Sequence, residues 1–161
     1  MDAEKFTKKS LEVIESCEKL AYEYNNQELT QAHLMYALVT VEDSLIAKLL
    51  TNMGINMDAF TGECEKLVAN RPKVSGGQLF TSPEFSKALI QAEKEAKQMG
   101  DDYISVEHIF LGLLEKADKD IKRVINAYGI TRGKFLEVLA NIRGNRKVES
   151  DNPEDTYDAL N

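Results

Sequence analysis

The chain repeats itself at a fixed offset of 75 positions, the distance from His33 to His108. This single register holds without a gap over about sixty residues, which indicates duplication of one supersecondary unit. The identical pairs include Leu38 with Leu113, Asp43 with Asp118, Ile46 with Ile121, Gly54 with Gly129 and Phe60 with Phe135. Both copies should therefore share a fold. A residue kept in both copies is expected to serve that fold, whereas a residue found in one copy is freer to serve a function.

The first copy shows four stretches in which apolar residues recur every three or four positions, a pattern that predicts four amphipathic helices. The first stretch runs from Phe6 to Tyr24. Thr30, Asp43 and Asn56 are predicted to begin the next three helices, because short polar side chains cap helix N-termini. Gly54 is predicted to end the third helix in a left-handed turn.

The second copy carries the same kinds of residue at its predicted helix starts and ends. Helix starts are predicted at Ser82 (followed by Pro83), Ser105, Asp118 and Thr131, and helix ends at Gly100, Gly129 and Gly144. We therefore expect an all-α fold of eight helices, arranged as two tandem four-helix repeats related by a pseudo-two-fold axis. Repeat 1 covers about residues 6–72, the inter-repeat loop 72–80 and repeat 2 about 80–146, all within one domain of residues 1–148.

Charge separates the end of the chain from the rest. Residues 149–161 hold five acids and no Lys or Arg, which leaves 22 acids against 20 bases elsewhere. A nearly neutral body lacks the basic surface of a nucleic-acid binder, so no nucleic-acid partner is expected. We interpret residues 149–161 as a mobile acidic linker belonging to a longer protein.

No apolar run is long enough to cross a bilayer, and the first residues do not form a signal peptide. We therefore expect a cytoplasmic protein without a membrane partner. Cys17 and Cys64 align with Ala92 and Leu139 in the other copy. This alignment predicts two free thiols packed in an apolar core, not a disulfide.

Catalytic motifs are missing from the sequence. There is no phosphate-binding loop, HExxH, CxxC or Gly-x-Ser-x-Gly pattern, so neither a metal nor a cofactor is expected. His33 and His108 are the strongest catalytic candidates. Because they occupy equivalent positions at the start of equivalent helices, a structural role is favoured, and a small hydrolase using one of them is the catalytic alternative.

Three apolar side chains fall outside the predicted core stripes. Leu11 and Tyr22 lie opposite the stripe of the first helix, and Ile90 lies opposite the stripe of the fifth. Such residues can line a shallow patch for an apolar segment of a partner. The alternative is that they are ordinary scattered surface residues.

These motifs resemble a known family. The segments 30–35 (TQAHLM) and 105–110 (SVEHIF) resemble the paired motifs of the N-terminal Clp repeat domain of AAA+ unfoldases. Residues 71–77 (RPKVSGG) and 152–160 (NPEDTYDAL) resemble the ClpB-type disaggregases more than their ClpC-type relatives.

The resemblance implies a substrate-recognition domain without a catalytic site of its own. It would bind exposed apolar segments of unfolded or aggregated proteins and pass them to its own ATPase modules. The fragment would be a monomer, and the parent a homohexamer that uses ATP and Mg. Thr7, Asp101 and Glu107 match positions linked to substrate handling in the family, whereas Gln91, Glu95 and His108 are polar at positions expected to line an apolar groove.

The resemblance also leaves an alternative. It is an adaptor-docking or phosphoarginine-binding domain of a ClpC-type unfoldase, and the resemblance implies that such domains hold phosphoarginine with a Glu before the His of each repeat. This chain has Glu107 in the second copy and Ala32 in the first, so one of the two acids is missing.

Overall fold

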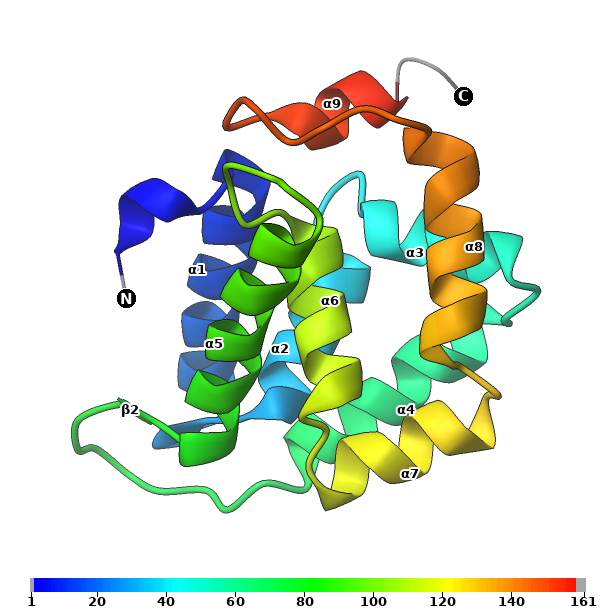
Figure 1. Cartoon of the computed structure of the whole chain (residues 1–161). Coiled ribbons are helices and arrows are strands. Elements are labelled where there is room, and N and C mark those ends of the chain that lie inside the picture. Colours follow the sequence, from blue (N-terminus) through cyan, green and yellow to red (C-terminus); the bar gives the residue numbers. More distant parts are fainter. Residues whose placement is uncertain (1, 159–161) are drawn as a thin grey trace.

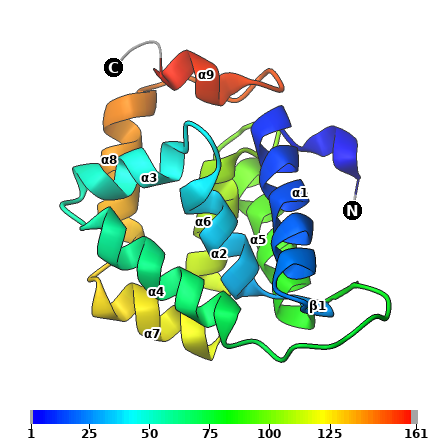
Figure 2. The same ribbon diagram turned by 180° about the vertical axis from the view of Figure 1, so that it is seen from behind.

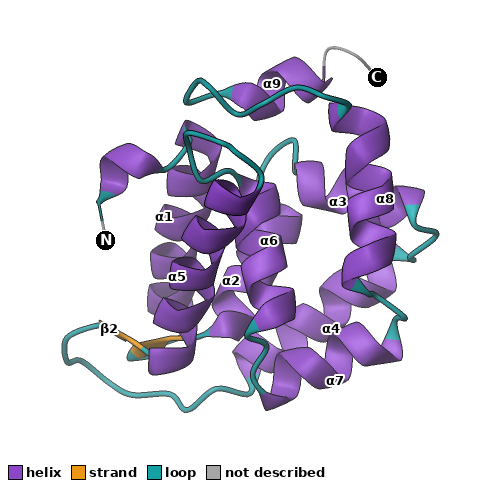
Figure 3. Cartoon of the chain, viewed as in Figure 1, coloured by secondary structure: helices purple, strands orange, loops and turns teal. Residues whose placement is uncertain are grey.

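The structure is a computed structural model that describes residues 2–158. Helices account for nearly all of its regular structure (Figure 3). In the first copy a short 3-10 helix, η1 (Ala3–Lys5), precedes four α-helices. These are α1 (Lys8–Glu23), α2 (Gln31–Thr40), α3 (Leu45–Asn52) and α4 (Met57–Ala69).

The second copy repeats this succession. Its helices are α5 (Pro83–Gln98), α6 (Val106–Glu115), α7 (Lys119–Ala127) and α8 (Arg132–Arg143). The predicted all-α fold with eight repeat helices is thus confirmed. A further helix, α9 (Pro153–Asp158), follows the second copy, and two strands of two residues each, β1 (Glu28–Leu29) and β2 (Phe80–Thr81), complete the described elements.

Most predicted caps are confirmed, but the start of α3 is a correction. Ser44, not Asp43, caps α3: its hydroxyl accepts the Ala47 N–H at 3.0 Å and donates to the Leu38 carbonyl at 2.5 Å. Asp43 adopts a left-handed φ of 54°, which turns the chain before the helix begins. Its counterpart Asp118 does cap α7, as predicted.

The packing of the helices reveals the pseudo-two-fold relation. Helices α2 and α6 contact each other near the centre of the body (Figures 1 and 2). Around them the contacts occur in exchanged pairs: α1 packs on α6 while α5 packs on α2, and α3 packs on α8 while α7 packs on α4. Each copy therefore completes its core with helices of the other copy.

The extended segments of the two copies also pair with each other. Strand β1 pairs in parallel with β2, which aligns Leu29 with Thr81. Phe6 forms the equivalent parallel bridge with Ile104, the counterpart of Leu29. The segment before the first helix of each copy thus pairs with the other copy.

The core is apolar and contains both thiols. Cys17 and Cys64 are free and buried, as predicted. The rings of Phe110 and Phe135 pack at a tilt of 39°, with centroids 4.5 Å apart. At Gly112 the backbones of α5 and α6 approach closely, because an added Cβ would lie 2.3 Å from the Ala88 carbonyl oxygen.

The end of the chain differs from the expectation of a mobile linker. Up to residue 158 it lies over the body, with Val148, Glu154 and Tyr157 buried (Figure 1). The acidic composition suggested a solvated segment, but Glu154 finds hydrogen-bond donors on the body and Tyr157 joins the hydrophobic core. Residues 159–161 lie outside the described part, and a connection to an ATPase module stays a prediction. No described helix combines the length and the apolar character needed to span a membrane.

Candidate functional site

The two histidines occupy equivalent buried positions. In repeat 1, Nδ1 of His33 accepts the Thr30 backbone N–H at 3.0 Å, as the side chain of the third residue does in a capping box. Nε2 therefore carries the proton and donates to Oδ1 of Asn26 at 2.9 Å. Burial, with a smaller effect of Arg71, lowers the pKa of His33 to about 4. The ring is a neutral structural element at the start of α2.

Repeat 2 builds the same arrangement with a charged partner. Nδ1 of His108 accepts the Ser105 N–H at 2.9 Å, and Nε2 donates to Oδ2 of Asp101 at 2.7 Å. Asp101 is the counterpart of Asn26. Both histidines are completely buried and both nitrogens of each ring are engaged, so neither ring can reach a substrate in this arrangement.

Asp101 is the centre of an ion-pair cluster that repeat 1 lacks. Its Oδ1 accepts hydrogen bonds from Nη2 of Arg143 and from the Val148 N–H. Although burial opposes ionisation, the bonds from His108, Arg143 and Val148 lower the pKa of Asp101 to about 2. The counterpart of Arg143 in repeat 1 is Val68. The cluster is therefore ionised at neutral pH and confined to repeat 2.

Glu107 lies against the same arginine. Its Oε2 is 3.5 Å from Nη1 of Arg143, and its side chain is completely buried. Within the described residues neither carboxylate oxygen has a hydrogen-bond partner. Because Arg143 of the same chain already faces this carboxylate, Glu107 does not offer an open site to the guanidinium of a ligand.

Thr7, in the first copy, is linked to the same region through Glu154. Its hydroxyl caps α1 by accepting the Ser10 N–H and donates to Oε2 of Glu154 at 2.8 Å. The structure thus brings Thr7, Asp101 and Glu107 into one region under the end of the chain. All three are buried, so none of them is open to a polypeptide partner in this arrangement.

The predicted apolar surface residues are exposed. Tyr22 is 67%, Ile90 50% and Leu11 37% exposed. Leu11 and Tyr22 are separated by eleven positions, about three helical turns, so they lie along one face of α1 about 16 Å apart. They form no continuous patch by themselves, and their role in binding stays a prediction.

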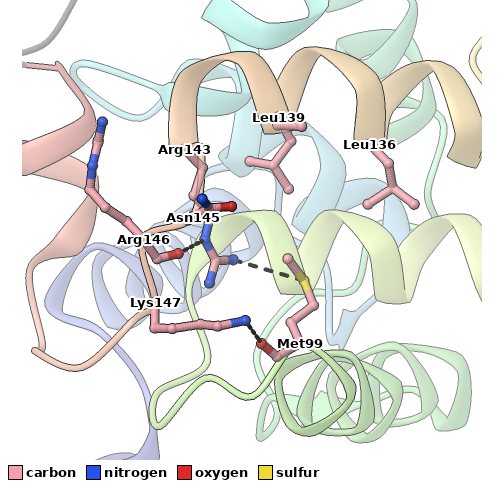
Figure 4. Close-up of a pocket in the computed structure, with 9 residues that line it drawn as sticks. Met99, Leu136, Leu139, Arg143, Asn145, Arg146 and Lys147 are labelled. Atoms are coloured by element: carbon pink, nitrogen blue, oxygen red, sulfur yellow. Dashed lines mark hydrogen bonds between the residues drawn. The ribbon is translucent and has the colours of Figure 1, made fainter.

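A groove between the end of α5 and α8 is a candidate that the sequence did not indicate. It encloses about 340 Å³ and contains both apolar and basic residues. In Figure 4, Met99 lies opposite Leu136 and Leu139, with Arg143, Asn145, Arg146 and Lys147 along one side. We call this feature the α5–α8 groove; Ala140 and Gly144 complete its lining.

Hydrogen bonds hold the basic side of the groove in place. Nζ of Lys147 donates to the Met99 carbonyl at 2.7 Å, and Nε of Arg143 donates to the Arg146 carbonyl at 2.9 Å (Figure 4). The groove thus combines an apolar wall with the ammonium group of Lys147, which is held in place, and the side chain of Arg146; the charge of Arg143 is paired with Asp101 and Glu107. Such a lining suits a polypeptide segment with an apolar side chain next to an acidic one.

A polar clasp connects α5 to α8 one turn away from Met99. Glu95 accepts two hydrogen bonds from Arg132, at 2.6 and 3.0 Å, and a third from Gln91 at 2.9 Å. Although burial opposes its ionisation, these hydrogen bonds lower the pKa of Glu95. Gln91 and Glu95, polar at expected groove positions, therefore hold the two helices together at one end of the groove.

The buried cluster and the α5–α8 groove differ in the contacts that they provide. Among residues 2–158, no group of three or more His, Cys, Asp or Glu side chains is arranged to hold a metal ion. The buried cluster offers ion pairs and hydrogen bonds, and the α5–α8 groove offers apolar contact and positive charge. Sequence reasoning missed the groove because Leu136 and Ala140 interleave with the core stripe of α8; their exposed side is visible only once α5 is placed.

Comparison with known proteins identifies the family. Residues 5–128 match the family described as the Clp repeat (R) N-terminal domain. The chain therefore belongs to this family, whose members include N-terminal domains of ClpB-type AAA+ chaperones.

Individual relatives agree with this assignment. The chain is 40% identical over 166 residues to the chaperone protein ClpB of Nitratidesulfovibrio vulgaris and 39% identical over 165 residues to that of Clostridium tetani; each match covers 99% of this chain and 19% of the relative. The chain thus spans about a fifth of the length of these curated relatives. The N-terminal domain of Hsp104 from Candida albicans shares the fold, with a TM-score of 0.82 at 20% identity over 93% of this chain and 99% of that one.

Proposed function

We propose that this Clp repeat domain captures exposed apolar segments of unfolded or aggregated polypeptides for a ClpB-type disaggregase. The observation that carries the proposal is the α5–α8 groove, which places Met99, Leu136 and Leu139 beside the basic Arg146 and Lys147. Family membership and the complete burial of both histidines, whose ring nitrogens are all engaged, support a binding role.

The rest of the parent protein belongs to this proposal. The domain would pass captured segments to ATPase modules that use ATP and Mg in a cytoplasmic homohexamer, while the domain itself is monomeric and does no chemistry. The match to about a fifth of each ClpB relative supports this division of labour. A shallow groove on one domain predicts weak affinity, with a Kd on the order of hundreds of micromolar, which several copies on one ring would strengthen.

The proposal is tested with a permanently unfolded probe, a reduced and alkylated protein that carries a fluorophore. Fluorescence anisotropy would report its binding to the chain and to Leu136→Asp, which places a charge on the apolar wall beside Met99. We expect at least a fivefold loss of affinity. Val74→Ser is the matched control, because Val74 is an exposed apolar residue in the inter-repeat loop.

A second pair of variants tests the predicted surface patch. If Leu11→Ser and Ile90→Ser weaken binding while Leu136→Asp does not, the binding site lies on α1 and α5. If the probe does not bind at millimolar concentrations of chain, the proposal is wrong. Far-UV circular dichroism would verify that each variant remains folded.

A further inference from the structure

The segment that follows α8 is attached to the body at three successive points. The Val148 N–H donates to Asp101, and the Val148 carbonyl accepts the Asp102 N–H at 2.8 Å. The Asp151 carbonyl accepts the Lys8 N–H at 2.7 Å, which satisfies a free donor in the first turn of α1. Glu154 provides the third attachment. These contacts connect one continuous segment to both copies of the repeat.

Glu154 is the central contact of α9. Its Oε2 accepts the Thr7 hydroxyl at 2.8 Å and the Val106 N–H at 3.3 Å, so one oxygen bridges the starts of α1 and α6. Tyr157 lies three positions further, on the same face of α9, and is 1% exposed. α9 therefore places an acid and an aromatic ring together on the body.

The surroundings of Glu154 disfavour a charge on this carboxylate. Oε1 is buried without a hydrogen-bond partner in the described part of the chain. The charged groups around it are Glu107 on α6, Arg143 on α8, and Lys8, Lys9 and Glu12 on α1. Arg143 pairs with Glu107 and Asp101, so it does not neutralise Glu154 directly. Burial, followed by the negative charge of Glu107, raises the pKa of Glu154 to about 7.

We propose that Thr7, the Val106 N–H and Glu107 form a reversible docking site for α9 of the same chain, in which Glu154 binds as the neutral acid. In this view Thr7, Asp101 and Glu107 are positioning residues. They hold the segment that leads away from the domain, and they do not touch a captured polypeptide. The role in substrate handling that the family resemblance predicts for them would then act through the mobility of the domain.

The docked segment also borders a second cavity next to the α5–α8 groove. A second cavity, of about 430 Å³, lies between Pro153 and Tyr157 on one side and Asn145, Arg146 and Lys147 on the other. The last three residues also line the α5–α8 groove. Release of α9 would remove one wall of this second cavity and leave the basic side of the groove open.

Protonation of Glu154 determines whether low or high pH favours docking of α9. In released α9 the exposed Glu154 has an ordinary pKa near 4.5, whereas the docked acid has the higher value of about 7. The docked form therefore binds more protons than the released form. The extra stability that protonation gives to docking is complete below pH 4.5. It is lost as pH rises towards 7, with roughly a tenfold increase of the release constant per pH unit in between.

Amide hydrogen exchange of Val106, measured by NMR on the whole chain, tests the proposal. The protection factor, which corrects for the intrinsic pH dependence of exchange, should fall roughly tenfold per pH unit between pH 5 and 7. Glu154→Gln retains the acceptor oxygen without a charge, so its protection factor should be independent of pH. Glu149→Gln, which changes an exposed acid in the same segment, is the matched control and should behave as the unmodified chain.

Two further variants distinguish docking from a general effect on stability. Tyr157→Ala should lower the Val106 protection factor at every pH, because the aromatic anchor is lost. Glu107→Gln removes the negative charge that helps to raise the pKa of Glu154. The pH range over which the Val106 protection factor falls should therefore become narrower. A Val106 protection factor that is the same at pH 5 and 7, or that Tyr157→Ala leaves unchanged, would overturn the proposal. Since no polypeptide is added, this result is independent of binding in the α5–α8 groove.

Discussion

The two copies begin their second helix in the same way, but their buried histidines have different hydrogen-bond acceptors. Each begins its second helix with a hydroxyl residue and a buried histidine, and each uses Nε2 of that histidine to reach the loop before the helix. In repeat 1 the acceptor is the neutral Asn26, whereas in repeat 2 it is the ionised Asp101. The histidine is therefore part of the fold, and the charge is particular to the second copy.

The difference shows which residues were free to diverge. Asp101, Glu107 and Arg143 stand where repeat 1 has Asn26, Ala32 and Val68. All three lie near the segment that follows α8. At the equivalent place in repeat 1 the chain continues into the inter-repeat loop, where Nδ2 of Asn26 donates to the Pro72 carbonyl at 3.2 Å. The added charges thus lie where the segments that follow the two copies differ.

The helix pairs differ as well. Gly112 on α6 and Ala88 on α5 correspond to Ala37 and Val13 in repeat 1. Smaller side chains allow α5 and α6 to approach until a Cβ at position 112 would meet the backbone. Repeat 1 accommodates a methyl group at the same position.

The largest expected effect comes from making repeat 2 resemble repeat 1 at a single position. Asp101→Asn leaves Arg143 buried without its principal acceptor, and loss of one partner of a buried ion pair costs about 3–5 kcal/mol. Urea denaturation monitored by circular dichroism would measure this loss. Asp102→Asn, at the exposed neighbouring residue, is the control.

Two further substitutions complete the change of repeat 2 to the arrangement of repeat 1. The triple variant Asp101→Asn, Glu107→Ala, Arg143→Val reproduces the uncharged arrangement of repeat 1. It should be more stable than Asp101→Asn alone, because no charge remains buried without a partner. If the triple variant is less stable than the single one, the cluster is not a unit.

The next largest effect concerns the close helix pair. Gly112→Ala should destabilise the fold by about 3 kcal/mol. The added methyl group would clash with the Ala88 carbonyl oxygen, and relief of the clash would require one helix backbone to move. Thermal or urea unfolding would measure the change. The reciprocal Ala37→Gly should cost only about 1 kcal/mol, the ordinary penalty for Gly within a helix. Equal effects at the two positions would contradict the closer approach in repeat 2.

An effect of similar size is expected from the pH dependence of His33. Its pKa is about 4 in the folded chain and near 6.5 in the unfolded chain, so the unfolded state takes up the proton first. The stabilisation is complete above pH 6.5 and declines as pH falls towards 4, by about 3 kcal/mol.

Ring ¹³C shifts would show His33 neutral at pH 5.5. The variant His33→Gln does not titrate, so its free energy of unfolding should fall less between pH 7 and pH 4.5 than that of the unmodified chain. A His33 midpoint near 6.5 would contradict the buried neutral ring.

The smallest effect concerns the thiols. Cys17→Ala installs the residue that repeat 2 has at position 92, and should cost about 1 kcal/mol for the lost packing of one sulfur. Burial raises the pKa of both thiols, that of Cys64 to about 12. Both should therefore resist Ellman's reagent until the chain unfolds. Rapid labelling of the native chain would contradict a buried position.

The fold could be predicted from the sequence because its signals are local. Apolar stripes and capping residues lie within one or two turns of the helices that they specify, and duplication provides each signal twice. The error at Asp43 had a local cause too. Asp43 and Ser44 are adjacent and either could cap the helix. The left-handed backbone of Asp43 makes Ser44 the cap, and the sequence does not reveal this turn.

The candidate sites were less predictable because their partners are distant. Thr7 and Glu154 are separated by 147 positions, so no periodicity connects them. Arg143, near the end of a helix, has the sequence position of a solvated side chain, yet it is buried against Asp101. The resemblance to a family indicated Thr7, Asp101 and Glu107 but not their burial, and the α5–α8 groove required the placement of both helices.

The exchanged pairing of the extended segments has a consequence for the ancestry of the fold. Phe6 needs Ile104, and Leu29 needs Thr81, so a single unit standing alone would have an unsatisfied edge and a half-open core. Two separate units could satisfy each other only as a homodimer. A chain cut within the loop at Gly76-Gly77 should therefore yield two pieces that recombine into the native body, with neither folding stably in isolation.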